Sequence, residues 1–203
     1  MPETLEIHGV TDSRTLRTLW MAEELGLEYV QHPVHFRGDA GSESFRAINP
    51  NGRVPAIVDG GVVVWESMAI NLHLARTRCS SLTPEDSVGW SHAEMWSFWV
   101  MTECEKPLLS AIVARQGLFG YPPDEQRARR RFAELERPLG VLEGHLGARD
   151  WLIADRFTVA DLNVASVLLW LRDGAFDLAP WPRAAAWLDR CTDREALARA
   201  RSR

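Results

Sequence analysis

The stretch around Val54 has the residue types needed to bind the backbone of a small ligand. A turn sequence, Asn-Pro-Asn-Gly at residues 49–52, delivers the chain into an apolar run at residues 54–58. Pro55 lies at the start of that run, and a proline has no N–H to donate to a strand ladder. The main-chain groups of its neighbour Val54 are therefore available to pair with the backbone of a ligand.

The pair Glu66-Ser67 has the groups that would bind the charged ends of a zwitterion. It follows an apolar strand and opens a helix, whose first N–H groups have no intrahelical partner and carry the positive end of the helix dipole. These groups suit a carboxylate, and the Ser67 hydroxyl adds a donor. Glu66 can accept hydrogen bonds from an ammonium group. Together with Val54, the pair indicates a site for a short zwitterionic peptide.

No sequence pattern indicates a metal centre or another common catalytic motif. The six histidines show no i,i+4 pairing with acidic residues that would suggest a metal site, and the three cysteines, Cys79, Cys104 and Cys191, lie far apart. The chain has no G-x-S-x-G, no phosphate-binding glycine loop and no H-E-x-x-H. We therefore expect no bound metal and three free thiols.

The composition is typical of a globular protein and does not favour a nucleic-acid or membrane-surface partner. The chain has 203 residues, of which 46% are hydrophobic and 25% charged, and a formal net charge of −5 at pH 7. No apolar run approaches the roughly 18 residues that span a bilayer. The first residues lack the basic and apolar regions of a signal peptide. We expect a cytoplasmic protein that binds neither nucleic acid nor membrane.

The spacing of apolar residues divides the chain into two parts, and the first part holds the elements that must position the candidate residues. Up to about residue 76, strand-like runs alternate with helical ones, and Asp59-Gly60-Gly61 is a hairpin signal. We expect strands at residues 5–8, 28–34, 54–58 and 62–65, helices at residues 13–25 and 66–76, and a short helix within residues 36–48. The order β-α-β-(α)-β-β-α predicts a mixed α/β domain over residues 1–78.

The second half of the chain shows only helical spacing. We expect helices over residues 87–116, 124–146, 158–172 and 182–201, with kinks near Pro107 and Pro138. Together they predict an all-α domain over residues 87–203. Thr158 to Asp161 matches a capping box at a helix start, which makes Asp161 a structural residue rather than a catalytic acid.

Several motifs at these spacings resemble the glutathione transferase family, of the cytosolic type. They are N-P-N-G-R-V-P-A-I-V-D at residues 49–59, W-E-S-M-A-I at residues 65–70, W-x-x-E-E-L-G-L-x-Y at residues 20–29 and F-T-V-A-D-L at residues 157–162. The resemblance runs through nearly the whole chain. It implies an α/β thioredoxin-like N-terminal domain and an all-α C-terminal domain that carries the electrophile pocket and the dimer interface. It also implies a cis peptide bond before Pro55.

The resemblance assigns glutathione-binding roles residue by residue. Val54 would pair main chain to main chain with the cysteinyl part of glutathione, and Glu66 and Ser67 would hold the γ-glutamyl end. Arg53 stands where the family often has a basic residue facing the glycyl carboxylate. The family sometimes takes an acidic residue from the partner subunit, for which Glu103 is the candidate. The co-substrate implied is glutathione, with no metal.

The residue that would activate the glutathione thiol has two candidates. A free thiol has a pKa of about 8.5, so only about 3% is thiolate at pH 7. The family places Tyr, Ser or Cys after the first strand, and neither Tyr nor Cys occurs before Tyr29. Ser13-x-x-x-Arg17 resembles the serine type, as in bacterial theta- or beta-like members. Thr11 is the second candidate, and Ser13 can instead be a plain helix N-cap.

The activity implied by the resemblance is that of a glutathione S-transferase, a detoxifying cytoplasmic homodimer whose thiolate attacks a small apolar electrophile. Met95, Trp96, Trp99 and Phe119 are candidates for the electrophile pocket, and the alternative for the two tryptophans is core or dimer packing. The same thiolate supports glutathione-dependent isomerisation or dehalogenation. The isomerase branch usually has a Ser-Ser-Cys run where this chain has Thr-Asp-Ser at residues 11–13. A binding protein that kept the fold without turnover is a further hypothesis.

Overall fold

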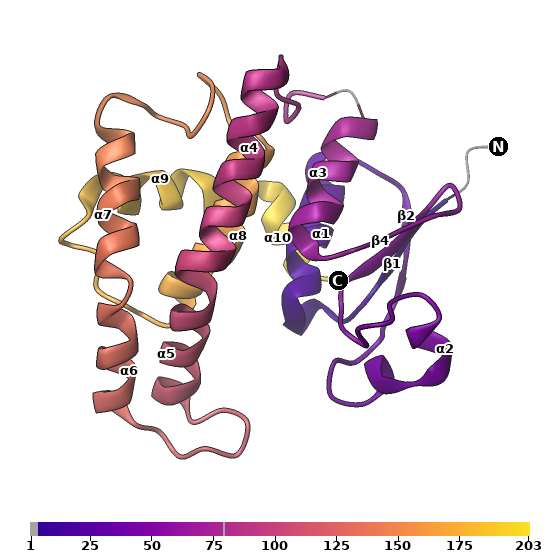
Figure 1. The fold of residues 1–203 in the computed structure, drawn as a ribbon, viewed down its shortest axis with the longest axis horizontal. Coiled ribbons are helices and arrows are strands. Elements are labelled where there is room, and N and C mark those ends of the chain that lie inside the picture. Colours follow the sequence, from indigo (N-terminus) through magenta and orange to yellow (C-terminus); the bar gives the residue numbers. More distant parts are fainter. Residues whose placement is uncertain (1–3, 79) are drawn as a thin grey trace. The chain divides into compact units, whose positions relative to one another are not determined.

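The computed structural model describes residues 4–78 and 80–203 and divides the chain into two compact units (Figure 1). Unit 1 runs up to Thr83 and also contains Arg194–Arg203, and unit 2 comprises Pro84–Asp193. Unit 1 is mixed α/β and unit 2 is all-helical, in agreement with the two periodicities of the sequence. The helical domain expected from the sequence included the last ten residues, whose contacts instead lie in unit 1.

Unit 1 is built on a four-stranded sheet with the strand order β2-β1-β3-β4. β1 (Leu5–His8) pairs in parallel with β2 (Tyr29–His32) and antiparallel with β3 (Ala56–Asp59). β4 (Val62–Trp65) completes the sheet through the hairpin that joins it to β3. The parallel pair β1–β2 needs a crossover connection, which helix α1 provides, whereas the antiparallel hairpin β3–β4 needs only a tight turn. This arrangement is the thioredoxin-like fold that the family resemblance implies.

The two faces of the sheet have different surroundings. Leu5 and Ile7 of β1 point to one face and are buried, whereas Glu6 and His8 alternate with them and point to the other. α2 (Glu43–Arg46) covers part of this second face, where Phe45 belongs to a buried cluster with Val54 and Ala56. This cluster anchors the segment that leads into β3.

α1 (Leu16–Glu24) begins three residues later than the sequence predicts. The backbone at Asp12 and Ser13 is not helical, with Ser13 at φ −147° and ψ −174°. Because Ser13 is extended, its side chain can accept from the N–H of Thr15 ahead of the helix proper. The spacing of apolar residues does not show this irregular turn, since the turn depends on side-chain hydrogen bonds.

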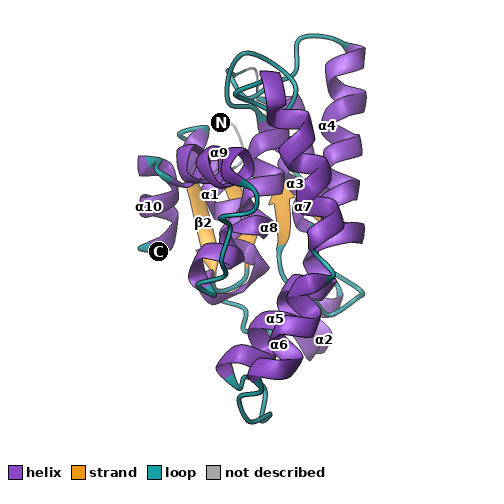
Figure 2. Ribbon diagram, turned by 90° about the vertical axis from the view of Figure 1, so that its left-hand side faces the viewer, coloured by secondary structure: helices purple, strands orange, loops and turns teal. Residues whose placement is uncertain are grey.

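α3 (Ser67–Thr77) follows β4 directly, within one residue of the expected bounds. It packs against α1, β3 and β4. α10 (Glu195–Arg201) returns to unit 1 and lies beside α1 in both views (Figures 1 and 2). The first turns of α1 and α3 are therefore held next to the same sheet.

Unit 2 consists of helices joined by short turns and loops. They are α4 (Ser87–Trp99), α5 (Lys106–Gln116), α6 (Glu125–Ala133), α7 (Glu136–His145), α8 (Val159–Asp173) and α9 (Pro182–Thr192). A wider helical turn at residues 100–105 separates α4 from α5, just before Pro107. Pro138 lies in the first turn of α7, which follows the break after α6. Both interruptions agree with the expected effect of proline inside a helix.

The capping box at the start of α8 has the predicted form. The Asp161 carboxylate accepts from the Thr158 N–H and hydroxyl, each at 3.0 Å, and from the Leu152 N–H at 2.9 Å. The indole N–H of Trp187 donates to the same buried carboxylate at 3.0 Å. Four donors to one fully buried side chain confirm that Asp161 is structural.

Two of the three cysteines lie in the described part of the chain. Cys104 and Cys191 are buried and neither forms a disulfide, as expected. Burial raises the pKa of the Cys104 thiol to about 12, so it is not a ready nucleophile. Cys79 lies outside the described residues.

None of the helices within residues 4–78 and 80–203 combines the length and the apolar composition that a bilayer-spanning segment requires.

α10 is fastened to α1 through the carboxylate of Glu23. Arg199 and Arg203 each donate to that carboxylate at 2.9 Å, and the Tyr29 hydroxyl donates at 2.8 Å. Burial alone would raise the pKa of Glu23, but these hydrogen bonds outweigh it and hold the pKa below its ordinary value of 4.5. The ionised form of Glu23 therefore stabilises the packing of α10.

We expect Glu23→Gln to lower the free energy of unfolding by about 1–2 kcal/mol at pH 7, because two arginines lose a charged acceptor. The loss is no larger because both arginine side chains are half-exposed to solvent. A carboxyl with a lowered native pKa contributes stability above its unfolded pKa, and this contribution is lost as the pH falls through the native value. The difference between wild type and variant should therefore shrink below about pH 4.5. Urea unfolding between pH 7 and pH 3.5 measures it.

The matched control is Glu195→Gln, which changes an exposed carboxylate 3.8 Å from Arg199 and should leave stability unchanged. A Glu23→Gln deficit that stays constant down to pH 3.5 would contradict this role for Glu23.

Candidate functional site

Asn49 fixes the turn that leads into β3. Its buried Nδ2 donates to the carbonyl of Arg53 at 2.6 Å, and its Oδ1 accepts from the N–H of Asn51 at 3.0 Å. Gly52 has a φ of 60°, and a Cβ there would come within 2.9 Å of the Ala40 carbonyl. The Asn-Pro-Asn-Gly sequence is therefore required by hydrogen bonding at its first residue and by space at its last.

The turn fixes the position of the Val54 main chain but makes no hydrogen bond with it. The Val54–Pro55 peptide bond is cis, as the family resemblance implies. β3 begins only at Ala56, and in the described part of the chain neither the N–H nor the carbonyl of Val54 has a hydrogen-bond partner. Its side chain is buried against Phe45 and Ala56. One donor and one acceptor in a fixed backbone thus remain for a ligand.

Ser67 opens α3 beside a buried arginine. The Arg17 side chain is only 2% exposed, and its Nη1 donates to the Ser67 hydroxyl oxygen at 3.4 Å. Asn71 donates to the carbonyl of Arg17 at 3.3 Å and ties α3 to α1. The guanidinium charge and the first N–H groups of α3 both favour an anion at this position.

Glu66 precedes α3 with an unusual backbone conformation. Its φ is 73° and its ψ is 116°, in a region that costs a non-glycine residue on the order of 1–3 kcal/mol. Its carbonyl accepts from the N–H of Ile70 at 2.9 Å, so the first helical hydrogen bond is kept. Strained residues of this kind concentrate at binding sites, and the Glu66 side chain is exposed and accessible.

The Ser13 hydroxyl lies in the turn before α1 and has one proton to donate. Its Oγ accepts from the Thr15 N–H at 3.1 Å, lies 2.8 Å from Thr15 Oγ1 and donates to the Val10 carbonyl at 2.6 Å. A hydroxyl has one proton, so donation to a ligand requires that proton to leave its present acceptor. The Thr11 hydroxyl donates to the carbonyl of Arg203 at 2.9 Å.

These segments come together at the end of β1. Gly9 follows β1 with a φ of 140°, and a Cβ there would lie 2.0 Å from Thr15 Oγ1 and 3.0 Å from Val54 Cβ. Only glycine allows this approach, which brings the turn before α1 next to the Val54 segment. The contact between Arg17 and Ser67 then connects α1 to the start of α3.

Two of the expected site residues have no fixed partner in unit 1 or unit 2. The Arg53 side chain is exposed, and in the described residues no contact positions its guanidinium. Glu103 is exposed in unit 2, where it lines a hollow of about 320 Å³ together with Trp99, Thr102, Arg137, Pro138 and Val141. Their roles stay predictions.

The candidate electrophile residues of unit 2 fall into two groups. Trp96 is buried in edge-to-face contact with Trp99 and His145, which is core packing. Met95 and Phe119 are exposed, and Trp99 is partly exposed at the hollow described above. Only the last three have surface that a ligand could contact.

Sequence reasoning noted Arg17 as part of a pattern but did not give it a role. Its contact with Ser67 joins residues 50 positions apart through the packing of α1 against α3. The sequence signal that could have identified it is an arginine three and four residues before Trp20 and Met21, on the apolar side of the helix, because a charge buried there is almost always paired.

Family models match both halves of the chain. The glutathione S-transferase N-terminal domain matches residues 6–76, and the glutathione S-transferase C-terminal domain matches residues 98–195. The first match contains Val54, Ser67 and the turn before α1, which are the residues assembled above.

Individual proteins agree with these matches. The chain is 30% identical over 193 residues to the probable glutathione S-transferase GSTF2 of Oryza sativa subsp. japonica, covering 90% of this chain and 89% of that one. A solved glutathione S-transferase-I bound with lactoylglutathione superimposes with a TM-score of 0.88 at 25% identity, over 98% of this chain and 99% of that one. Elongation factor 1-gamma of Sus scrofa is 30% identical over 138 residues, which cover 68% of this chain but only 31% of that protein.

We expect Asn49→Ala to lower the free energy of unfolding by about 1–3 kcal/mol, because the carbonyl of Arg53 and the N–H of Asn51 lose the buried Asn49 side chain as their partner. Urea unfolding at pH 7 measures it. Asn51→Ala is the matched control at an exposed position and should change stability by less than about 0.5 kcal/mol. Equal urea midpoints for the two variants would show that Asn49 does not hold this turn.

Proposed function

This chain belongs to the glutathione S-transferase family, and we propose that unit 1 binds glutathione and lowers the pKa of its thiol for attack on a small apolar electrophile. The observation that carries the proposal is the unpartnered main chain of Val54, in a fixed turn that Gly9 brings close to the turn before α1. A peptide ligand supplies the complementary carbonyl and N–H groups. The two carboxylates and one ammonium group of glutathione match the charges of Arg17, Arg53 and Glu66.

The proposed contacts follow from the chemistry of each group. The γ-glutamyl carboxylate binds at the first N–H groups of α3 with the Ser67 hydroxyl, beside the Arg17 charge. The γ-glutamyl ammonium binds the Glu66 carboxylate, and the glycyl carboxylate binds Arg53. The cysteinyl backbone pairs with Val54, which places the sulfur near the start of α1.

Ser13 is the proposed activator of the thiol. Lowering a thiol pKa by about 2 units requires roughly 2.7 kcal/mol of preferential thiolate stabilisation. One hydroxyl hydrogen bond supplies part of it, and the N-terminus of α1 supplies more. The Ser13 proton now goes to the Val10 carbonyl, and a thiolate is the stronger acceptor. The Thr11 hydroxyl is instead held by the carbonyl of Arg203.

The proposed reaction is nucleophilic addition or displacement by the glutathione thiolate. The sulfur forms a bond to an electrophilic carbon, and in displacement the leaving group departs with the bonding electron pair. Binding both reactants converts a bimolecular step into an intramolecular one. We propose Met95, Trp99 and Phe119 as contacts for the apolar electrophile. Cytoplasmic detoxification is the physiological role we propose, on the strength of the family.

The subtype we propose is the serine type, from the position of Ser13. Relatives of this chain that carry the family's name include plant and fungal proteins, so the bacterial assignment is no part of the proposal. A binding protein without turnover is the second candidate function. The similarity to elongation factor 1-gamma favours this second candidate, because that relative is not named as a transferase.

We also propose that the protein forms a homodimer through unit 2. Val88 and Phe98 are large, exposed side chains of α4, and their spacing of ten residues places them about 80° apart around the helix, on one face. Phe98 is 69% exposed, an unusual position for a phenylalanine unless a partner covers it. Glu103 of the partner subunit is the acidic residue proposed to reach glutathione across this dimer.

We expect bound glutathione to titrate about 2 pH units below free glutathione, followed by thiolate absorbance against pH at saturating protein. Ser13→Ala should restore the value of the free thiol while the binding isotherm of glutathione changes little. Thr11→Ala is the matched control and should leave the lowered value intact.

Three outcomes would contradict this assignment. Restoration by Thr11→Ala alone would make Thr11 the activator. A normal thiol pKa in bound wild-type glutathione would favour the binding protein. No binding at millimolar glutathione would remove the function altogether.

We expect wild type to sediment with the mass of two chains and Phe98→Glu with the mass of one, because the variant places a charge in an apolar contact. Tyr121→Glu, an exposed aromatic outside α4, is the control and should remain a dimer. Sedimentation velocity at micromolar protein measures both. A wild-type protein with the mass of one chain would exclude the proposed dimer.

A further inference from the structure

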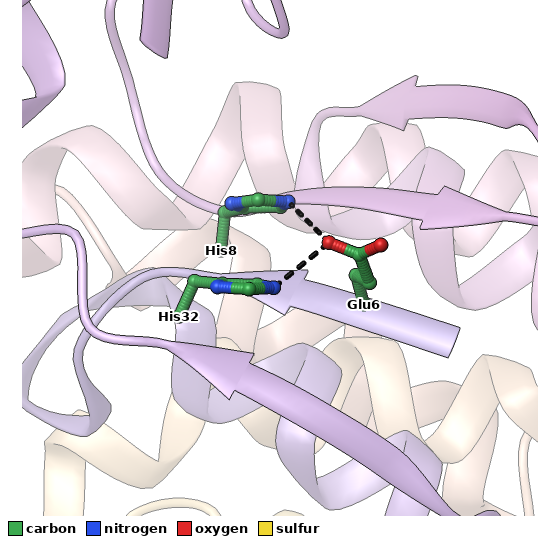
Figure 3. A group of neighbouring side chains, drawn as sticks. All are labelled: Glu6, His8 and His32. Carbon is green, nitrogen blue, oxygen red and sulfur yellow. Dashed lines mark hydrogen bonds and ion pairs between the residues drawn. The ribbon is translucent and has the colours of Figure 1, made fainter. Parts of the chain in front are cut away.

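Three side chains of types that can bind metals gather on the face of the sheet opposite Leu5 and Ile7. They are Glu6 and His8 of β1 and His32 of β2 (Figure 3). β1 and β2 are parallel, and their register places His8 directly opposite His32. Glu6 lies two residues before His8 on the same strand and therefore on the same face.

The three side chains converge on a single point. Glu6 Oε2 lies 2.8 Å from His32 Nε2 and 3.8 Å from His8 Nε2. Figure 3 shows the two imidazole rings stacked with both of these nitrogens directed at the same carboxylate oxygen. The ring centroids are 4.5 Å apart, and one potential ligand atom from each residue lies within 4.8 Å of the other two.

His8 differs from its two neighbours in burial and in hydrogen bonding. Its side chain is 9% exposed, whereas those of His32 and Glu6 are 42% and 43% exposed. His8 Nε2 is buried and makes no hydrogen bond. A buried polar nitrogen without a hydrogen-bond partner, facing a carboxylate and a second imidazole, is the feature that a bound cation would satisfy.

We propose that Glu6, His8 and His32 form a binding site for a divalent transition-metal ion, with Zn²⁺ as the representative ion. Two imidazole nitrogens and one carboxylate are a ligand set that zinc takes in proteins, whereas Ca²⁺ and Mg²⁺ prefer oxygen ligands alone. No residue of the set belongs to the proposed glutathione site, so the two sites can be tested separately.

The geometry needs only a small adjustment to hold the ion. Two ligand atoms that are each about 2.1 Å from one zinc ion can be at most about 4.2 Å apart. The largest separation in the cluster is within 4.8 Å, so the ligands must contract by well under 1 Å. Glu6 and His32 are half-exposed and free to make this movement, while His8 is fixed by the core.

Binding also requires a redistribution of protons. His32 Nε2 and Glu6 Oε2 share a hydrogen bond, so one of the two carries a proton between them. For ligation through Nε2, that proton must move to Nδ1 or be released to solvent. The half-exposed edge of the cluster leaves room for water as a fourth ligand, as in zinc sites with three protein ligands.

The test is a titration of the full-length, tag-free chain with Zn²⁺ by calorimetry, and with Co²⁺ by visible absorption, in the absence of glutathione. We expect one ion per chain. His32→Gln and Glu6→Gln should each weaken binding by at least about tenfold, and both change half-exposed side chains. His92→Gln removes an exposed histidine of α4 and is the matched control, with unchanged affinity expected.

Ring-nitrogen NMR of the histidines identifies the ligands directly, without any change at the buried His8. We expect Nε2 of His8 and His32 to shift on addition of Zn²⁺ while His92 does not. Absence of binding, equal affinity of all three variants and wild type, or weakening by His92→Gln alone would each overturn the proposal. The cluster would then be a carboxylate–histidine hydrogen-bond pair and no metal site.

Discussion

The backbone of Val54, fixed in position but left without hydrogen bonds, is the constraint around which unit 1 is organised. A main-chain donor and acceptor in a buried setting are costly to leave unpaired, so such a segment must be held by other groups. Asn49 holds the turn before it through two hydrogen bonds, and Pro55 has no N–H to offer the ladder. The sheet begins one residue later, at Ala56.

The surrounding elements place charge next to that backbone. Gly9 allows the turn before α1 to approach Val54, and Arg17 on α1 reaches Ser67 at the start of α3. α1 is in turn held from outside by Arg199 of α10 and by Arg203, which follows α10; both donate to Glu23. Residues from the beginning, middle and end of the chain thus fix the end of the sheet where β1 ends and β3 begins. A preorganised site of this kind lowers the ordering cost of binding a flexible tripeptide.

Local signals in the sequence were sufficient for the elements but not for their contacts. β1 and β4 have the expected bounds, because alternation and the Asp-Gly-Gly turn are local. The late start of α1 depends on hydrogen bonds of Ser13, and the return of α10 to unit 1 depends on ion pairs with α1. His8 and His32 meet only through parallel strand register, so a search at helical spacings could not find them.

Hydrogen exchange at the Val54 amide measures whether its main chain pairs with glutathione. We predict fast exchange in the free protein, because this N–H has no partner, and exchange slowed by at least about tenfold when S-methylglutathione saturates the site. The Ile57 amide, inside the β3 ladder, is the internal reference and should be protected in both states. An unchanged Val54 rate at saturation would contradict main-chain pairing and, with it, the proposed mode of glutathione binding.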